Sequence, residues 1–472
     1  MGVSLLTIPI YIRLVGDARY GVLAVLWSFL GYFGWFDLGL GRATAQRIAV
    51  LGNSAAERVA TTFWTALVMN GALGIVGGIL IWPVSNYFFE HVISMGADLR
   101  SELAWGLPWL TLAVPLMTLS GVLSGALQGR AQFLEMNIIS VSGSMLLQIL
   151  PLLVAWGRGP DLAWLIPSVI LTSLLSAIAM FWRCKVHVFH DHAPSISRDD
   201  AKSMLLFGGW VTVTSLVGPL MVVLDRFVIG ATLGASAVTY YTVPYQLAQR
   251  SNLLPGALTS ALFPRLAMAH GVEGKQLTAR AYRSLAAVMT PLILGALLFV
   301  EPFFRLWINP EFASKTAVTA QILLLGFWIN GLAFVPFAKL EAGGRADAIA
   351  KCHLVELLPY LILLFVGLHF WDLPGAAAAF ALRTFGDCLL LLLLAGDLRN
   401  GLDTIKWPIV LLAVAFGVAV SLPVGSAVWW LAAGCLLLMG LAWSWWSAPA
   451  DLRNLTIRLA NKMLGQSREA LR

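Results

Sequence analysis

Three arginines stand inside apolar stretches that are long enough to cross a bilayer: Arg226, Arg250 and Arg383. A charge surrounded by lipid is costly unless it lines a wet cavity or finds a partner. A guanidinium group binds a carboxylate or a phosphate through two parallel hydrogen bonds, so an arginine in a cavity suits an anionic ligand. Each arginine could instead pair with a neighbouring acid and only brace the packing of helices.

The residues around Arg250 favour a cavity. Four polar residues at three- and four-residue spacing share one helix face, namely Thr242, Gln246, Gln249 and Arg250. No carboxylate lies within reach of Arg250 along the same helix. We therefore predict that Arg250, Gln246 and Gln249 line a substrate-binding cavity.

Arg383 and Asp387 are four residues apart, which is close enough for the two side chains to pair along one helix face. Such a pair can be purely structural, or it can open when the protein changes conformation, and the sequence leaves both possibilities open. We predict that Arg383 is a second anion contact in the cavity and that Asp387 serves gating or ion coupling.

Three further charges lie close to the ends of predicted membrane spans. Asp225 and Arg226 lie near the outer end of their span, where a structural or a gating role is expected. Asp37 lies near the cytoplasmic end of another span and could cap a helix, latch two lobes together or bind a cation. We predict no metal site and no cofactor, because the cysteines show no metal-ligand spacing. One loop contains His187, His190, Asp191 and His192, a mixture that could bind a transition metal, but a solvated interfacial loop is the favoured interpretation.

The elements that position these residues are predicted to be transmembrane helices. Of the 472 residues, 59% are apolar and 12% are charged, whereas about 25% are charged in soluble domains. Fourteen apolar stretches alternate with short polar loops, at 2–14, 20–40, 61–89, 102–125, 138–157, 162–182, 206–230, 237–263, 283–307, 318–338, 354–370, 374–396, 407–424 and 427–447. The expected fold is an all-α polytopic membrane protein with about 14 transmembrane helices.

The basic residues predict the orientation. With the amino terminus in the cytoplasm, 22 of the 31 lysines and arginines fall in cytoplasmic loops and the tail, and six fall in outer loops. This bias agrees with the positive-inside rule and places both termini in the cytoplasm. The net charge of +7 then reflects topology and contact with anionic lipid headgroups, and we expect no nucleic-acid partner.

Two cytoplasmic loops indicate an internal repeat. Gln128-Gly129-Arg130-Ala131 and Gly343-Gly344-Arg345-Ala346 are six predicted spans apart, which preserves the direction of insertion. This spacing predicts two parallel six-helix lobes. The expected organisation is an N-terminal lobe, a cytoplasmic linker, a C-terminal lobe, an extra helix pair and a basic cytoplasmic tail, over residues 1–185, 186–205, 206–400, 401–447 and 448–472.

Several short motifs resemble a known family. Arg19-Tyr20-Gly21-Val22-Leu23, Phe36-Asp37-Leu38-Gly39-Leu40-Gly41-Arg42-Ala43, Asp225-Arg226-Phe227-Val228-Ile229-Gly230 and Phe263-Pro264-Arg265 are similar to motifs of Wzx-like oligosaccharide flippases. These are polysaccharide exporters of the multidrug/oligosaccharidyl-lipid/polysaccharide (MOP) superfamily. The resemblance implies a MATE-like fold with two lobes around a central cavity that opens to one side of the membrane at a time.

The resemblance also implies a function. The protein would move a lipid-linked oligosaccharide, with an undecaprenyl-type carrier, from the cytoplasmic to the outer leaflet of a bacterial inner membrane. Polysaccharide polymerase machinery would be its partner. A MATE-type cation antiporter and a lipid II flippase stay open as alternatives, although an antiporter should have carboxylates rather than arginines inside the membrane. No Walker motif, nucleophile elbow or HExxH motif is present, so we expect no enzyme. Proton, sodium and membrane potential all stay open as energy sources.

Overall fold

The structure is a computed structural model that describes residues 2–33, 39–52, 55–190, 192–204, 224–268, 271–454 and 457. The described residues are helices and short connections without strands, in two compact units, Met1–Thr242 and Val243–Arg472. Within this part of the chain, nine helices are long and apolar enough to cross a membrane. The all-α membrane fold is therefore confirmed, whereas the count of fourteen spans stays a prediction.

In the first unit, a central helix, α5 (Ala97–Gly129), packs against α3 (Leu40–Leu51), α4 (Ala56–Tyr87) and α7 (Leu162–Cys184). The other named elements of this unit are α1 (Gly2–Val15), α2 (Asp17–Phe33), α6 (Phe133–Arg158) and the π-helical turns η2 (Phe88–Val92) and η3 (Lys185–Phe189). Residues 198–204 and 224–233 are also helical. The α4–α5 contact depends on Gly74, because a Cβ there would lie 2.5 Å from the Cα of Pro115.

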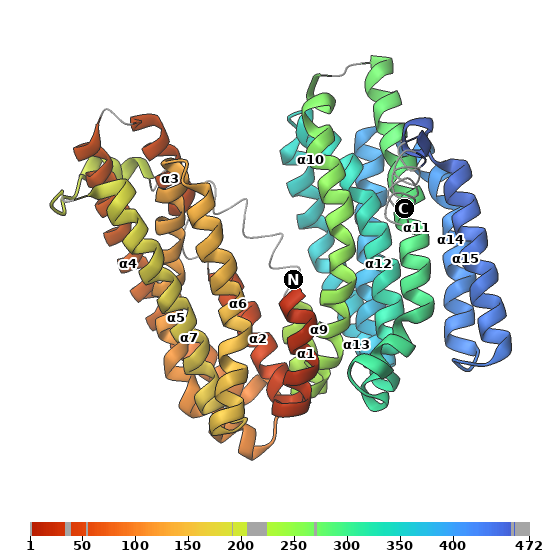
Figure 1. Ribbon diagram of the computed structural model, residues 1–472, viewed down its shortest axis with the longest axis horizontal. Helices are drawn as coiled ribbons and strands as arrows, with labels where there is room; N and C mark the ends of the chain where they lie inside the picture. Colours follow the sequence, from red (N-terminus) through yellow and green to blue (C-terminus); the bar gives the residue numbers. More distant parts are fainter. Residues whose placement is uncertain are drawn as a thin grey trace, which may run out of the picture. The chain divides into compact units, whose positions relative to one another are not determined.

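The second unit is built around α12 (Pro310–Ala342), which contacts α10 (Leu253–Met268), α11 (Gly271–Trp307) and α13 (Ala346–Ala395) (Figure 1). Two further helices, α14 (Leu398–Ser421) and α15 (Ala427–Ser447), pack on α11 and on each other. Helix α9 (Ala235–Gln249) runs across the boundary between the units and continues through the 3-10 turn η4 (Arg250–Asn252) into α10.

Helix α13 is a hairpin of two helical arms. A continuous helix of its 50 residues would be ~75 Å long, far more than the roughly 30 Å of a bilayer core. Trp371 and Asp372 have non-helical backbone angles, and Asp372 has a φ of 49°. On either side of this turn, the backbones of Gly367 and Gly375 lie against each other, since a Cβ on Gly375 would lie 1.9 Å from the carbonyl oxygen of Gly367. Residues far apart in sequence thereby come to face one another.

The two loops that suggested an internal repeat have one interaction in common. Arg130 donates from Nη1 to the carbonyl oxygen of Gly52 at 2.8 Å, at the end of α3. Arg345 donates from Nη1 to the carbonyl oxygen of Leu394 at 2.9 Å, in the last turn of α13. Both arginines satisfy carbonyl groups that a helix end leaves without an intrahelical partner. Each loop is therefore tied to a helix end outside the loop, that of α3 in the first case and that of the second arm of α13 in the other.

Candidate functional site

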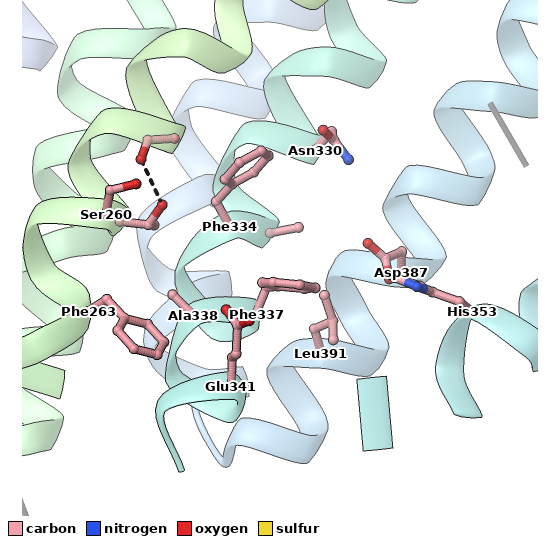
Figure 2. Close-up of a pocket in the computed structure, with 13 residues that line it drawn as sticks. Ser260, Phe263, Asn330, Phe334, Phe337, Ala338, Glu341, His353, Asp387 and Leu391 are labelled. Atoms are coloured by element: carbon pink, nitrogen blue, oxygen red, sulfur yellow. Dashed lines mark hydrogen bonds and ion pairs between the residues drawn. The ribbon is translucent and has the colours of Figure 1, made fainter. Parts of the chain in front are cut away.

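The second unit contains a cavity of about 700 Å³ between α10, α12 and both arms of α13. Figure 2 shows the side chains that surround it. Its apolar wall includes three phenylalanines, Phe263, Phe334 and Phe337. Its polar lining consists of hydrogen-bonding side chains and two acids, namely Thr259, Ser260, Asn330, His353, Glu341 and Asp387. Apolar walls with a few polar groups are the usual composition of a site for an organic ligand.

Local structure positions the polar groups of the cavity. Thr259 donates to the carbonyl oxygen of Pro255 at 2.8 Å, one turn earlier in α10. Asn330 of α12 accepts a hydrogen bond of 3.0 Å from the amide of Asn252, which belongs to η4. This bond fastens the turn that contains Arg250 to the wall of the cavity.

A group of four ionisable residues, here called the charged cluster, lies at the α13 side of the cavity. His353 and Glu356 come from the first arm, and Arg383 and Asp387 come from the second arm. Nε2 of His353 lies 3.7 Å from Oδ1 of Asp387, and the two side chains point toward each other in Figure 2. Glu356 and Asp387 are only 7% and 8% exposed. Burial of two carboxyl groups in a membrane-embedded unit is costly unless they find partners or line a wet cavity.

Arg383 lies among aromatic rings as well as acids. Its guanidinium carbon is 5.3 Å from the ring centre of Tyr360 and 5.6 Å from that of Phe380, which is cation–π distance. Asp387 interacts electrostatically with His353, Arg383 and Glu356. The structure thus brings the predicted pair Arg383 and Asp387 into one cluster, in which Asp387 lines the cavity and Arg383 is not among the lining residues.

The other predicted cavity residues lie on the segment that leads into α10. Gln246 and Gln249 occupy the last turn of α9, where Gln246 is half-buried and Gln249 is exposed. Arg250 is half-buried and begins η4, where the α-helix tightens to a 3-10 turn. None of these three is among the residues that line the 700 Å³ cavity of the described structure. Their role in binding substrate stays a prediction.

The predicted gating residues have different positions. Asp225 and Arg226 are both buried, and Oδ1 of Asp225 accepts a hydrogen bond of 2.7 Å from the backbone nitrogen of Arg226. Asp37 lies outside the described residues, as does most of the predicted span 206–230. The structure therefore leaves the gating roles as predictions.

The Arg19-Tyr20-Gly21 motif has a clear packing role in the first unit. Arg19 donates from Nε to Oε2 of Glu102 on α5 at 2.8 Å. A Cβ on Gly21 would lie 1.8 Å from the carbonyl oxygen of Ala235, so only glycine allows this approach between α2 and α9. Close by, the Tyr240 hydroxyl donates to the carboxylate of Asp17. The motif joins α2 to α5 and to the start of α9.

Solved structures with a similar helix arrangement are transporters. An inward-facing multidrug resistance MATE family transporter of the MOP superfamily aligns with 89% of this chain and 96% of its own, with a TM-score of 0.66 at 14% identity. The lipid II flippase MurJ, in an inward closed conformation, aligns with 93% of this chain and 95% of its own, with a TM-score of 0.65 at 13% identity. The chain therefore has the fold of MOP-superfamily transporters, as predicted.

The family follows from the sequence match. A family described as "Polysaccharide biosynthesis protein" matches residues 10–315, which is more than half of the chain, and the chain belongs to this family. A Shigella flexneri protein named "Putative O-antigen transporter" is 28% identical over 385 residues, 80% of this chain and 90% of its own. The teichuronic acid biosynthesis protein TuaB of Bacillus subtilis is 23% identical over 400 residues, 82% and 78% of the two chains. The predicted membership of the polysaccharide exporters is confirmed.

Proposed function

We propose that this protein is a flippase that moves a lipid-linked oligosaccharide from the cytoplasmic to the outer leaflet of a bacterial inner membrane. The family of polysaccharide biosynthesis proteins and the relative named for O-antigen transport support this substrate class. The fold shared with a lipid II flippase supports the mechanism of alternating access. The proposal includes an undecaprenyl-type carrier, cytoplasmic termini and cooperation with a polysaccharide polymerase, and it assigns no enzymatic activity.

The cavity of the second unit is the observation that carries the proposal. An oligosaccharide offers many hydroxyl groups, and the hydroxyls and amide of Thr259, Ser260 and Asn330 provide matching hydrogen-bonding partners. Phe334 and Phe337 add apolar surface for the less polar faces of sugar rings. A volume of about 700 Å³ is within the usual range for sites that hold an organic ligand, about 300–1,000 Å³.

We assign the anionic part of the substrate to the arginines. Arg250 and Arg383 would be its main contacts, with Gln246 and Gln249 beside Arg250. Asp387 would couple ion binding to the movement of the lobes, and Asp37, Asp225 and Arg226 would act in gating. The half-buried position of Arg250 supports this assignment, because part of the residue is accessible to water and to a ligand.

A cation antiporter is the second candidate, and one observation favours it. The buried carboxyls of Glu356 and Asp387 give the membrane interior two acids beside a cavity, which is the arrangement that a cationic substrate needs. Arg383 lies within the same cluster and opposes binding of an organic cation. The family of polysaccharide biosynthesis proteins and the relative named for O-antigen transport also favour the flippase over the antiporter.

Arg250→Ala tests the proposed function in cells that lack the wild-type gene. The loss of a charged hydrogen bond to the substrate should lower surface glycan by about 10-fold to 100-fold, while the amount of protein in the membrane stays normal. Arg399→Ala, at an exposed arginine in the first turn of α14, is the matched control and should leave surface glycan unchanged. Wild-type glycan levels in the Arg250→Ala strain would count against the assigned contact.

A further inference from the structure

A second cavity, here called the arginine pocket, lies where α10 ends and α11 begins (Figure 1). Its volume is about 610 Å³. The described residues that line it come from the last turn of α10 and the first three turns of α11, namely Arg265, Met268, Glu273, Gln276, Leu277 and Arg280. Those on α11 follow one another at three- and four-residue spacing, so one face of this helix turns toward the end of α10.

The lining of the arginine pocket is positively charged. Arg265 and Arg280 are both exposed, and among the described residues neither forms an ion pair. Arg183, at the end of α7, by contrast pairs with Glu135. Glu273 also lines the arginine pocket, and its three charged residues together carry a net charge of +1. A positive lining with two fork-shaped donor groups suits an anion that has several oxygen atoms.

The positions of the two arginines correspond to the headgroup layer of the membrane. Arg265 is two residues beyond the predicted span 237–263, and Arg280 is three residues before the predicted span 283–307. Helix α11 has 37 residues, or ~55 Å, which exceeds the roughly 30 Å of a bilayer core. Its polar first turns therefore extend beyond the apolar layer, on the side that the proposed orientation makes cytoplasmic. The phosphates of membrane lipids lie at this depth.

We infer that the arginine pocket is a docking site for the diphosphate group of the lipid-linked substrate. Two guanidinium groups match a diphosphate that links a lipid to a sugar, because this group has two phosphates and two negative charges. A glycerophospholipid such as phosphatidylglycerol offers one phosphate and one charge, so it is the poorer match. The inference names a site in addition to Arg250 and Arg383, and it rests on the proposed flippase function.

The arginine pocket adjoins the 700 Å³ cavity through the motif Phe263-Pro264-Arg265. Phe263 lines the 700 Å³ cavity, and Arg265, two residues later on α10, lines the arginine pocket. A diphosphate bound at Arg265 therefore holds the attached glycan close to the cavity that it enters. Glu273 repels the phosphates, which keeps the docked state weak enough for the substrate to move on.

Binding of undecaprenyl diphosphate to the purified full-length protein, measured by native mass spectrometry, tests the docking site without any transport. Every sample contains Arg250→Ala, so that binding at that proposed contact does not obscure the arginine pocket. Arg265→Ala and Arg280→Ala should each weaken binding by about 3-fold to 10-fold, because each removes a charged contact at an exposed site. Glu273→Gln should strengthen binding by about 2-fold to 5-fold, because it removes a negative charge beside the phosphates.

Arg283→Ala is the matched control. Arg283 is an exposed arginine of α11, one turn beyond Arg280 and outside the lining of the arginine pocket, so its removal should leave binding unchanged. Weakening by Arg283→Ala equal to that by Arg280→Ala would show a diffuse attraction to the basic end of the helix and would overturn the inference. Unchanged binding with both Arg265→Ala and Arg280→Ala would also overturn it.

Competition identifies the source of the phosphates. If phosphatidylglycerol or inorganic diphosphate at equal concentration displaces undecaprenyl diphosphate, the arginine pocket binds bulk anionic lipid or a soluble anion, and the inference is wrong. Transport separates this inference from the proposed function. If the variants change binding as expected but the wild-type protein moves no glycan in proteoliposomes, the proposed function fails and the diphosphate site stands. If glycan moves and the arginine substitutions change neither binding nor movement, only the inference fails.

Discussion

The close contact between the two arms of α13 allows a sharp test, because two glycines of the same arm have opposite surroundings. A Cβ on Gly375 would lie 1.9 Å from the carbonyl oxygen of Gly367, whereas a Cβ on Gly386 would meet nothing within 4 Å. Ordinary contact begins at 3.4 Å, so Gly375→Ala must force the arms apart by about 1.5 Å. Overpacking of this kind costs about 1–3 kcal/mol, and the backbone oxygen on the other arm has little freedom to yield.

The control substitution should have the opposite sign. Gly386→Ala adds a methyl group in open space and replaces the residue with the lowest helix propensity after proline, which should stabilise the helix by about 0.5–1 kcal/mol. For the purified protein in detergent, we expect the thermal unfolding temperature to fall with Gly375→Ala. With Gly386→Ala it should stay unchanged or rise. Equal shifts for the two variants would refute the hairpin contact and with it the juxtaposition of His353 and Asp387.

Two other contacts give predictions of the same kind. Lys339→Met should destabilise the protein by about 3–5 kcal/mol, because it leaves the buried Asp397 carboxylate without its partner. The double variant Lys339→Met/Asp397→Leu should regain most of the lost free energy of unfolding. Thermal unfolding of the two single variants and the double variant measures this, and additive effects of the two substitutions would contradict the pairing. Gly21→Val should abolish surface glycan, because the new side chain cannot fit against the carbonyl of Ala235. Normal glycan with that variant would show that α2 and α9 do not approach as described.

Part of the site could be predicted from sequence because it depends on local spacing. Arg383 and Asp387 share a helix face at a separation of four residues, and the structure places both in the charged cluster. His353 and Glu356 were missed. They are 34 and 31 residues away from Asp387, which both approach, and the turn at Trp371 and Asp372 folds the two arms together. The one available signal was Glu356, an acid inside the predicted span 354–370.

Helical periodicity was a less reliable guide around Arg250. The predicted polar stripe assumes one continuous α-helix, whereas the structure ends α9 at Gln249 and inserts η4 before α10. A 3-10 turn has three residues per turn, so the α-helical spacing on which the predicted stripe rests stops at this turn. Sequence patterns identify such a polar segment but do not show where the helix tightens.

Composition and hydropathy sufficed to predict the all-α membrane fold, because the bilayer fixes the length and apolar character of each spanning helix. The first predicted span shows where this reasoning weakens. Helix α1 has 14 residues, or ~21 Å, and its place depends on tertiary contacts. Tyr11 of α1 donates to the carbonyl oxygen of Gln148 on α6 at 2.9 Å, a contact that no hydropathy pattern reveals.

The most direct test of the proposed function is transport by the purified protein. In proteoliposomes that contain a lipid-linked oligosaccharide, we expect the wild-type protein to expose the glycan to an impermeant reagent on the opposite side. Ser260→Trp, which places a bulky ring in the cavity, should abolish this movement, whereas Ala261→Trp, at an exposed neighbour outside the cavity lining, should not. Undiminished movement with Ser260→Trp, or none with the wild-type protein, would contradict translocation through this cavity.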